Sequence, residues 1–125
     1  MIPKFRAWLK KEQKMDNEID HISWLEDELY CIGDGITYMV SAEDLVLMQS
    51  TGLKDKNGKE IFEGDIVKMA KDVYSEPTYY EVVRHYGGAY RLESKQHGCE
   101  LWLRHNGCEV VGNIYENPEL LEDKE

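Results

Sequence analysis

Apolar and charged positions alternate at the start of the chain. In the segment FRAWLK, Phe5, Ala7 and Leu9 occupy every second position, with Arg6, Trp8 and Lys10 on the other phase. A period of two is typical of a strand with one buried and one charged face. The pattern predicts a half-buried strand, and the following KKEQKM predicts a charged turn leading into a second, short strand.

Residues 16–49 mix helical and extended signals. Ile19, Ile22 and Leu25 are spaced three apart, so a short helix and a loop both stay open for residues 16–28. The segment CIGDGITYMV predicts two strands joined at Gly-Asp-Gly, because glycine supplies the positive φ of tight turns. Ser41 and the acids after it suit one helical turn, after which residues 45–49 return to extended structure.

Beyond Ile61 the pattern is strongly β. Candidate strands follow one another between glycine-containing turns: residues 66–69, 79–85, 89–93, 100–104 and 108–115. Within the fourth of these, Leu101-Trp102-Leu103 predicts a core strand. Short strands in this arrangement predict a small curled sheet or an SH3-like barrel.

These elements predict a mainly β protein with minor α content, built from short antiparallel strands. Residues 1–60 are expected to form an N-terminal β-rich lobe. Residues 61–125 are expected to form a small, C-terminal β-barrel-like lobe with an acidic tail. A chain of 125 residues accommodates either two such lobes or one compact unit.

The central stretch TGLKDKNGKEIFEGDIV, residues 51–67, has the glycines and charges of a phosphate or calcium loop without the spacing. Five residues separate Gly52 from Gly58, and Glu60 stands where a phosphate loop requires Ser or Thr. Aligned as a calcium loop, its first and last acidic ligands would fall at Leu53 and Gly64. Neither kind of site is expected.

The same stretch predicts two turns. In the first, residues 55–58, Asp55 caps the turn through its side chain, while Asn57 and Gly58 tolerate left-handed geometry. In the second, Glu63 and Asp65 bracket Gly64. They are spaced as an acid/base pair could be, but we expect Asp65 to accept backbone N–H bonds in the turn.

The net charge of −10 comes from two segments. Residues 16–28 hold six acids and no Lys or Arg, and residues 116–125 hold five acids and one Lys. An acidic chain lacks the basic surface that releases counterions from nucleic acid, so nucleic acid is an unlikely partner. The apolar runs are too short to span a bilayer, no secretory signal is visible, and the odd cysteine count predicts reduced thiols, which together favour the cytoplasm.

Two groups of residues suggest chemistry. His97, Cys99, His105 and Cys108 are soft ligands that could surround zinc, although their spacing matches no recognised zinc motif. A Cys/His nucleophile could use the same residues but lacks an orienting third group. We therefore expect no catalytic residue, metal site or cofactor, and favour turn-flanking histidines and buried thiols.

The N-terminal strand combines bases with aromatic residues, a pattern that can bind single-stranded nucleic acid by stacking. The residues concerned are Lys4, Phe5, Arg6, Trp8, Lys10, Lys11 and Lys14. A strand with one solvated, charged face produces the same pattern, and we favour that interpretation.

Three segments occur together in a recognisable order: KFRAW at residues 4–8, TGLKDKNGKEIFEGDIV at 51–67, and EVVGNIYENPELL at 109–121. In this combination the chain resembles the YopX family of small proteins encoded by bacteriophages and prophages. The resemblance implies a largely β protein that acts inside a bacterial host. It implies no catalytic or ligand-binding residues.

Three functions are weighed on this basis. The first is a non-enzymatic phage accessory protein that binds a host or phage protein in the host cytoplasm, with homo-oligomers a further possibility. The second is an SH3-like nucleic-acid-binding module, and the third a small metal-dependent enzyme. The first is preferred, since three tryptophans and eight tyrosines favour interfaces.

Overall fold

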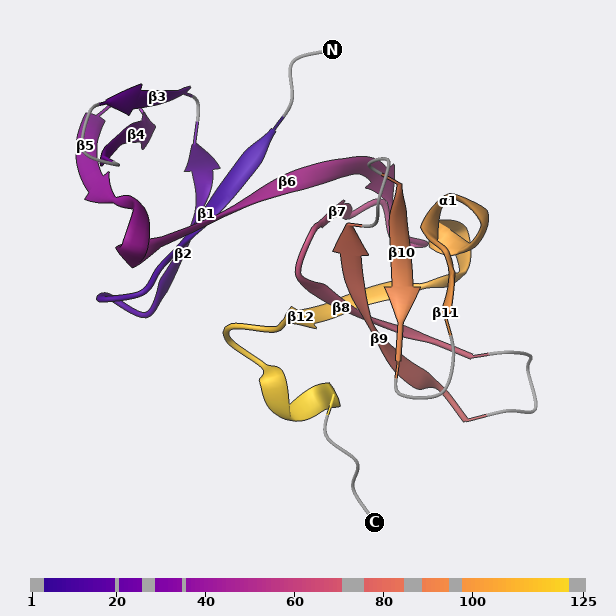
Figure 1. Cartoon of the computed structure of the whole chain (residues 1–125). Coiled ribbons are helices and arrows are strands. Elements are labelled where there is room, and N and C mark those ends of the chain that lie inside the picture. The colour runs from indigo at the N-terminus through magenta and orange to yellow at the C-terminus, as the bar shows by residue number, and fades with distance from the viewer. Residues whose placement is uncertain are drawn as a thin grey trace. The chain divides into compact units, whose positions relative to one another are not determined.

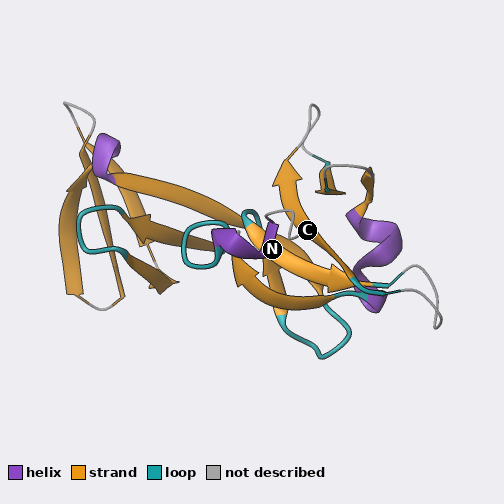
Figure 2. Ribbon diagram, turned by 90° about the horizontal axis from the view of Figure 1, so that it is seen from below, coloured by secondary structure: helices purple, strands orange, loops and turns teal. Residues whose placement is uncertain are grey.

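The computed structural model describes residues 4–19, 21–25, 29–34, 36–70, 76–84, 89–94 and 98–121. For residues 18, 21–25, 29–34 and 36–38 it describes the backbone alone. The chain is mainly β, as predicted, and divides into two compact units, Met1–Ser50 and Thr51–Glu125. Figure 1 and Figure 2 show the strands and short helical turns of each unit.

The first unit contains an antiparallel sheet centred on β1 (Phe5–Leu9). This strand pairs with β2 (Lys14–Ile19) on one side and with the first part of β6 (Leu45–Lys54) on the other. The charged turn between β1 and β2 is present, and its last residue, Gln13, has a positive φ of 54°. The buried residues Ala7, Leu9 and Leu45 form a small core.

The prediction that one face of β1 is exposed to solvent is wrong. Arg6 and Trp8 are only 6% and 5% exposed, so both faces of the strand are buried. An antiparallel sheet commonly leaves one face in water, but here side chains on both faces of its central strand are covered. The alternation in the sequence indicated the strand but did not indicate that its second face is also buried.

A three-stranded antiparallel meander completes the first unit: β3 (His21–Leu25), β4 (Leu29–Asp34) and β5 (Ile36–Ser41). The described part of residues 16–28 lies in β2 and β3, so it is neither the helix nor the loop that the sequence left open. The helical turn predicted after Ser41 is confirmed as a 3₁₀ turn, Ala42–Asp44. The extended segment predicted from Leu45 is β6.

The second unit is built on a five-stranded antiparallel sheet in the order β11-β10-β9-β8-β12. Its strands are β8 (Asp65–Met69), β9 (Thr78–Arg84), β10 (Tyr90–Glu93), β11 (Gly98–Glu100) and β12 (Glu109–Asn113). The sheet curls into an open half-barrel, which confirms the predicted curled sheet (Figure 1). The short β7 (Glu60–Phe62) pairs with β6.

One face of this sheet buries the core of the second unit. The core residues come from strands across the sheet and from the segments beside it: Ile61, Val67, Tyr80, Val82, Leu92, Leu101 and Cys108. Residues 51–60, expected with the N-terminal lobe, belong to this unit. Their place follows from contacts such as that of the Thr51 hydroxyl with the Ile61 carbonyl, 2.8 Å away.

The strand predicted for residues 100–104 is wrong beyond Glu100. The chain instead forms a helical turn, α1 (Leu101–Arg104), and then a 3₁₀ turn, His105–Gly107. Leucine and arginine are good helix formers and no residue of α1 is β-branched, so local propensity opposes a strand there. Only Leu101 of the predicted core strand is buried.

After β12 the described part of the chain ends in a 3₁₀ turn, Pro118–Leu121. None of the helices in the described ranges has the length and apolar character needed to cross a bilayer.

Candidate functional site

The turn at residues 55–58 is built around one buried carboxylate. Asp55 is 5% exposed, and its Oδ1 accepts the backbone N–H groups of Asn57 at 2.8 Å and Lys59 at 2.9 Å. Gly58 adopts a φ of +83°, which glycine takes without the strain of a Cβ. The predicted capped turn is therefore confirmed, with Gly58 rather than Asn57 in the left-handed conformation.

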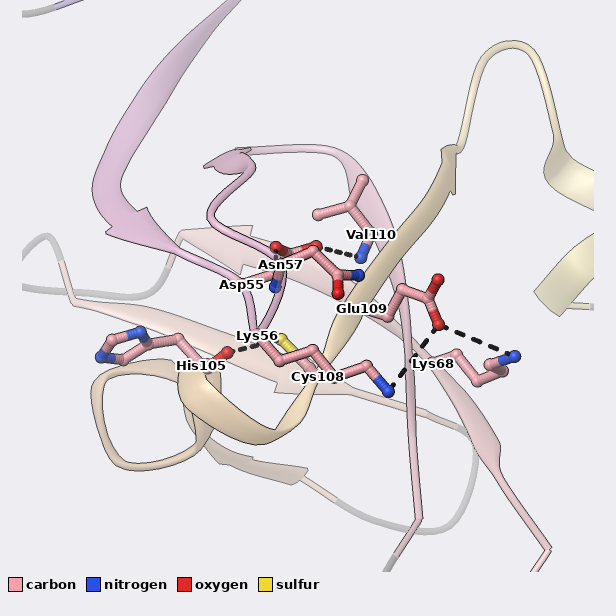
Figure 3. Close-up of polar contacts among 8 residues, drawn as sticks. All are labelled: Asp55, Lys56, Asn57, Lys68, His105, Cys108, Glu109 and Val110. Carbon is pink, nitrogen blue, oxygen red and sulfur yellow. Dashed lines mark hydrogen bonds and ion pairs between the residues drawn. The ribbon is translucent and has the colours of Figure 1, made fainter.

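The same turn also holds the outer edge of β12. Oδ2 of Asp55 accepts the N–H of Val110 at 2.9 Å (Figure 3), and the N–H of Lys56 donates to the carbonyl of Cys108 at 3.0 Å. Residues two apart on a strand present their backbone groups to the same edge. Since β8 occupies the other edge of β12, residues 55–56 cover the edge that the sheet leaves open.

The environment of Asp55 favours its ionised form. Burial alone would raise the pKa of the carboxyl group. The N–H groups of Val110, Lys59 and Asn57, together with the charge of Lys59, outweigh that effect and hold the pKa below its usual value. A carboxylate held in this way stabilises the fold and has no proton to exchange near neutral pH.

Asp65 has a comparable role in the second turn. It is 2% exposed, and its Oδ2 accepts the N–H of Phe62 at 2.8 Å. Gly64 lies between them with a φ of +87°; its N–H donates to the carbonyl of Val82 and its carbonyl accepts the N–H of Ile114, both at 2.9 Å. The expectation that Asp65 binds backbone N–H groups is confirmed.

The His/Cys group separates into described and undescribed members. His97 lies outside the described residues, so the four-ligand arrangement stays a hypothesis. His105 Nδ1 lies 2.7 Å from the carbonyl of Lys54, and the Cys108 thiol donates to the carbonyl of His105 at 3.3 Å. Over the described ranges, no three His, Cys, Asp or Glu side chains are grouped as a metal site would require.

Both described cysteines are free thiols with reduced acidity. Burial, and next the charge of Asp55, raises the pKa of Cys108 to about 11. Burial also raises the pKa of Cys99. Because the thiolate is the nucleophile and the metal-binding form, neither thiol is prepared for such chemistry at neutral pH.

The polar contacts around this turn continue at the surface. Glu109 lies between Lys56 and Lys68, with N–O distances of 3.9 and 3.8 Å (Figure 3). Partly exposed pairs at these distances contribute little to stability. They set the charge of the surface beside β12 without forming a binding pocket.

A second polar centre, which the sequence analysis missed, closes the segment after β12. Asn113 is 7% exposed; its Oδ1 accepts the N–H groups of Tyr115 and Glu116, and its Nδ2 donates to Glu116 Oε1 at 2.8 Å. Asn117 Oδ1 in turn accepts the N–H of Asn113. The signal for this turn was present in GNIYEN, where asparagine side chains can bond backbone groups two or three residues away.

Gly112 completes that centre by its lack of a side chain. A Cβ at this position would lie 2.7 Å from Cγ and 2.9 Å from Cβ of Asn117, closer than real Cβ atoms approach. The glycine therefore makes room for the asparagine that holds the turn.

A pair of carboxylates faces each other across β9 and β10. Glu81 pairs in register with Glu93, and the pKa of Glu81 is raised by burial and, second, by the charge of Glu93. Like charges directly opposite on neighbouring strands are destabilising. Sequence analysis missed this pair because register is a tertiary property.

The aromatic and basic residues of β1 are poorly placed for stacking nucleic acid. Trp8 and Arg6 are buried, and Lys11 forms an ion pair with Asp44 at 3.4 Å. Base stacking requires an exposed aromatic face. The structure thus removes Trp8 and Arg6 from the surface on which that hypothesis depended.

Among the described residues of the second unit, the large apolar side chains with the highest exposure lie on α1. Trp102 is 64% and Leu103 61% exposed, while Leu101 beside them is fully buried. The sequence analysis placed all three in a core strand, so it missed this surface. The exposed tryptophan was detectable only in the general sense that aromatic residues favour interfaces.

The chain matches the model of the YopX protein family over residues 4–122. Its fold is similar to the crystal structure of protein EF1440 from Enterococcus faecalis, with a TM-score of 0.66 and 34% sequence identity, covering 98% of this chain and 99% of that one. It is also similar to the crystal structure of YopX from Bacillus subtilis, with a TM-score of 0.65 and 22% identity, covering 97% of each chain. Comparison with curated proteins gives no match. Since the family model spans nearly the whole chain, this protein belongs to the YopX family.

Proposed function

We propose that this chain is a non-enzymatic protein-binding module, encoded by a phage or prophage and acting in the cytoplasm of the bacterial host. The proposed origin and setting rest on its membership of the YopX family. The proposed activity rests on the surface of the second unit.

The observation that carries the proposal is the exposed pair Trp102 and Leu103 on α1. Single exposed apolar residues are ordinary, but these two are adjacent on a helical turn that Leu101 anchors in the core. Tryptophan is enriched among the residues that dominate binding energy, because it buries a large apolar area at small entropic cost. A partner that covers this pair would remove both side chains from water.

The polar groups support a non-enzymatic role. Asp55 and Asp65 are buried and bonded to backbone N–H groups, and the pKa of Cys108 lies well above neutral pH. General acid/base and nucleophilic catalysis require accessible groups with a pKa near the working pH. These three side chains instead hold the turns and the core of the second unit.

The test is affinity capture from lysogenic host cells with the full chain as bait. Three baits are compared: the unchanged chain, Trp102→Ala, and Met39→Ala as a matched control, since Met39 is also 64% exposed but lies in the first unit. We expect a host or phage protein that the unchanged chain and Met39→Ala retain and that Trp102→Ala loses. Its direct binding is then measured by titration of the purified pair.

Failure to enrich any host or phage protein above an unrelated acidic bait would refute the proposed function. Retention of the partner by all three baits would support protein binding but move the interface away from α1.

A further inference from the structure

The exposed surface of α1 has a defined order of side chains. Successive residues of an α-helix are rotated by about 100° about its axis. Since Leu101 is directed into the core, Leu103 points most directly away from the core, and Trp102 and Arg104 lie on the two sides of Leu103. All three are exposed. We call Trp102, Leu103 and Arg104 the α1 face.

The charge of this face comes from Arg104. Among the residues that the structure describes, Arg104 has no ion-pair partner, whereas the preceding acid, Glu100, is bonded by Arg91 at 2.8 Å. The charge of Glu100 is thereby offset, and that of Arg104 is available. The α1 face is thus apolar with one basic side, on a chain whose net charge is −10.

We infer that the α1 face binds an acidic segment of another protein, in which an aliphatic or aromatic side chain lies beside Asp or Glu. This inference rests on the proposed function and names the chemistry of the partner. Leu103 and Trp102 would cover the apolar side chain, and the planar guanidinium of Arg104 would bind the carboxylate with two parallel hydrogen bonds.

Complementarity of charge selects this occupant. A basic segment would meet Arg104 with repulsion, and an apolar segment alone would leave the guanidinium without a partner at the rim. Glu100, the acid that adjoins α1 in sequence, is paired with Arg91 at 2.8 Å, and exposed charges farther apart than about 8 Å are screened at physiological salt. A second copy of the chain is the alternative occupant, which the sedimentation experiment below distinguishes.

The experiment selects binders from a random linear peptide library displayed on phage, with the full chain as target and Trp102→Ala as counter-selection. We expect the retained sequences to share Leu, Ile, Phe or Trp next to Asp or Glu. A synthetic peptide of the consensus should bind the unchanged chain about 10-fold or more tightly than Trp102→Ala or Leu103→Ala. Met39→Ala should bind it unchanged.

A charge exchange tests the role of Arg104 directly. Arg104→Glu should weaken the consensus peptide about 10-fold, and replacing the acid of the peptide by Lys should restore binding to that variant. Arg104→Lys should retain part of the affinity, since it keeps the charge but not the planar geometry. An unchanged urea midpoint for each variant shows that folding is intact.

Three results would overturn the inference. One is a selection that yields no consensus that both contains an acid and is bound less tightly by Trp102→Ala. Another is a cellular partner that Trp102→Ala retains as well as the unchanged chain does; this result leaves the proposed function standing. The third is dimerisation in sedimentation equilibrium that Trp102→Ala abolishes, which would assign the face to a second copy.

Discussion

Asp55→Asn distinguishes two roles of this side chain: its hydrogen bonds within the turn and its hydrogen bond to the edge of β12. In the protein, Oδ1 accepts two N–H groups within the turn, and Oδ2 accepts the N–H of Val110, which is 55 residues away in sequence. Asparagine has nearly the same shape but only one acceptor oxygen. If that oxygen keeps the two turn bonds, the amide NH₂ faces the N–H of Val110, donor against donor.

The magnitude follows from the bonds lost. A hydrogen bond to a charged group contributes about 1.5–3 kcal/mol, and a buried donor without an acceptor costs about 1–3 kcal/mol. We therefore expect Asp55→Asn to lower the free energy of unfolding of the second unit by about 2–3 kcal/mol. Asp55→Ala removes all three bonds and should lower it by about 3–5 kcal/mol, less than a simple sum because neighbouring bonds are not additive.

The assay is urea unfolding combined with native-state hydrogen exchange. In Asp55→Asn the amide of Val110 should lose protection while that of Asn57 keeps it, because only the long-range bond is broken. Glu109→Gln is the matched control, because it is also a carboxylate-to-amide change and lies on β12 next to Val110. Its two lysine contacts are long and partly exposed, so it should change stability by less than about 1 kcal/mol.

Acid titration gives a second, independent readout. The pKa of Asp55 is lower in the folded chain than in the unfolded one, so its contribution is fully present above the unfolded value of about 3.9 and is lost as pH falls through the folded value. The stability difference between the protein and Asp55→Asn should therefore be constant from neutral pH down to about 5 and shrink below about 4.

Two outcomes would refute this reasoning. The first is a loss in Asp55→Asn no larger than that in Glu109→Gln. The second is unchanged protection of the Val110 amide, which would mean that the edge of β12 is held without Asp55.

Four further predictions concern other parts of the chain. Cys108 should react with a disulfide reagent at pH 7.5 only as the chain unfolds, because burial and a pKa of about 11 keep its thiol protonated; rapid labelling under native conditions would contradict this. Gly112→Ala should destabilise the second unit by about 1–3 kcal/mol through contact with the turn beside it, whereas Gly107→Ala, with open space around it, should not; equal midpoints in urea would contradict this. Glu81→Gln should raise stability at neutral pH by about 0.5–1 kcal/mol, because it removes the burial of a charge and, second, the repulsion from Glu93; the gain should vanish in acid as the raised pKa of Glu81 is passed. In gel-shift titrations at low salt, single- and double-stranded DNA and RNA should not be retarded, and a salt-sensitive shift would favour the nucleic-acid hypothesis.

Much of the local structure was predictable because its causes are local. The capped turn at Asp55 and the N–H bond accepted by Asp65 follow from side chains that reach backbone groups two to four residues away. The strand pattern after Ile61 and the 3₁₀ turn after Ser41 follow from periodicity and turn composition in the same way. The family resemblance rests on three such local stretches, residues 4–8, 51–67 and 109–121.

Other features were wrong or missed because they depend on which segments meet. Trp8 was expected on an exposed face, but in the folded chain both faces of β1 are covered. Trp102 was expected in the core, and its exposure follows from the chain turning into α1 once Leu101 has filled the core position. A run of apolar residues in the sequence does not indicate which of their side chains are buried in the core.

The sequence by itself determined the turns at Asp55 and Gly64, that the strands are short and antiparallel, and to which family the chain belongs. Only the tertiary structure decided that Asp55 covers the edge of β12, because that edge becomes available after β8 has taken the other one. It likewise decided which apolar residues remain on the surface. Hydrogen-bond partners within a turn are set by short chain geometry, whereas edges and surfaces are what remains after the strands have paired.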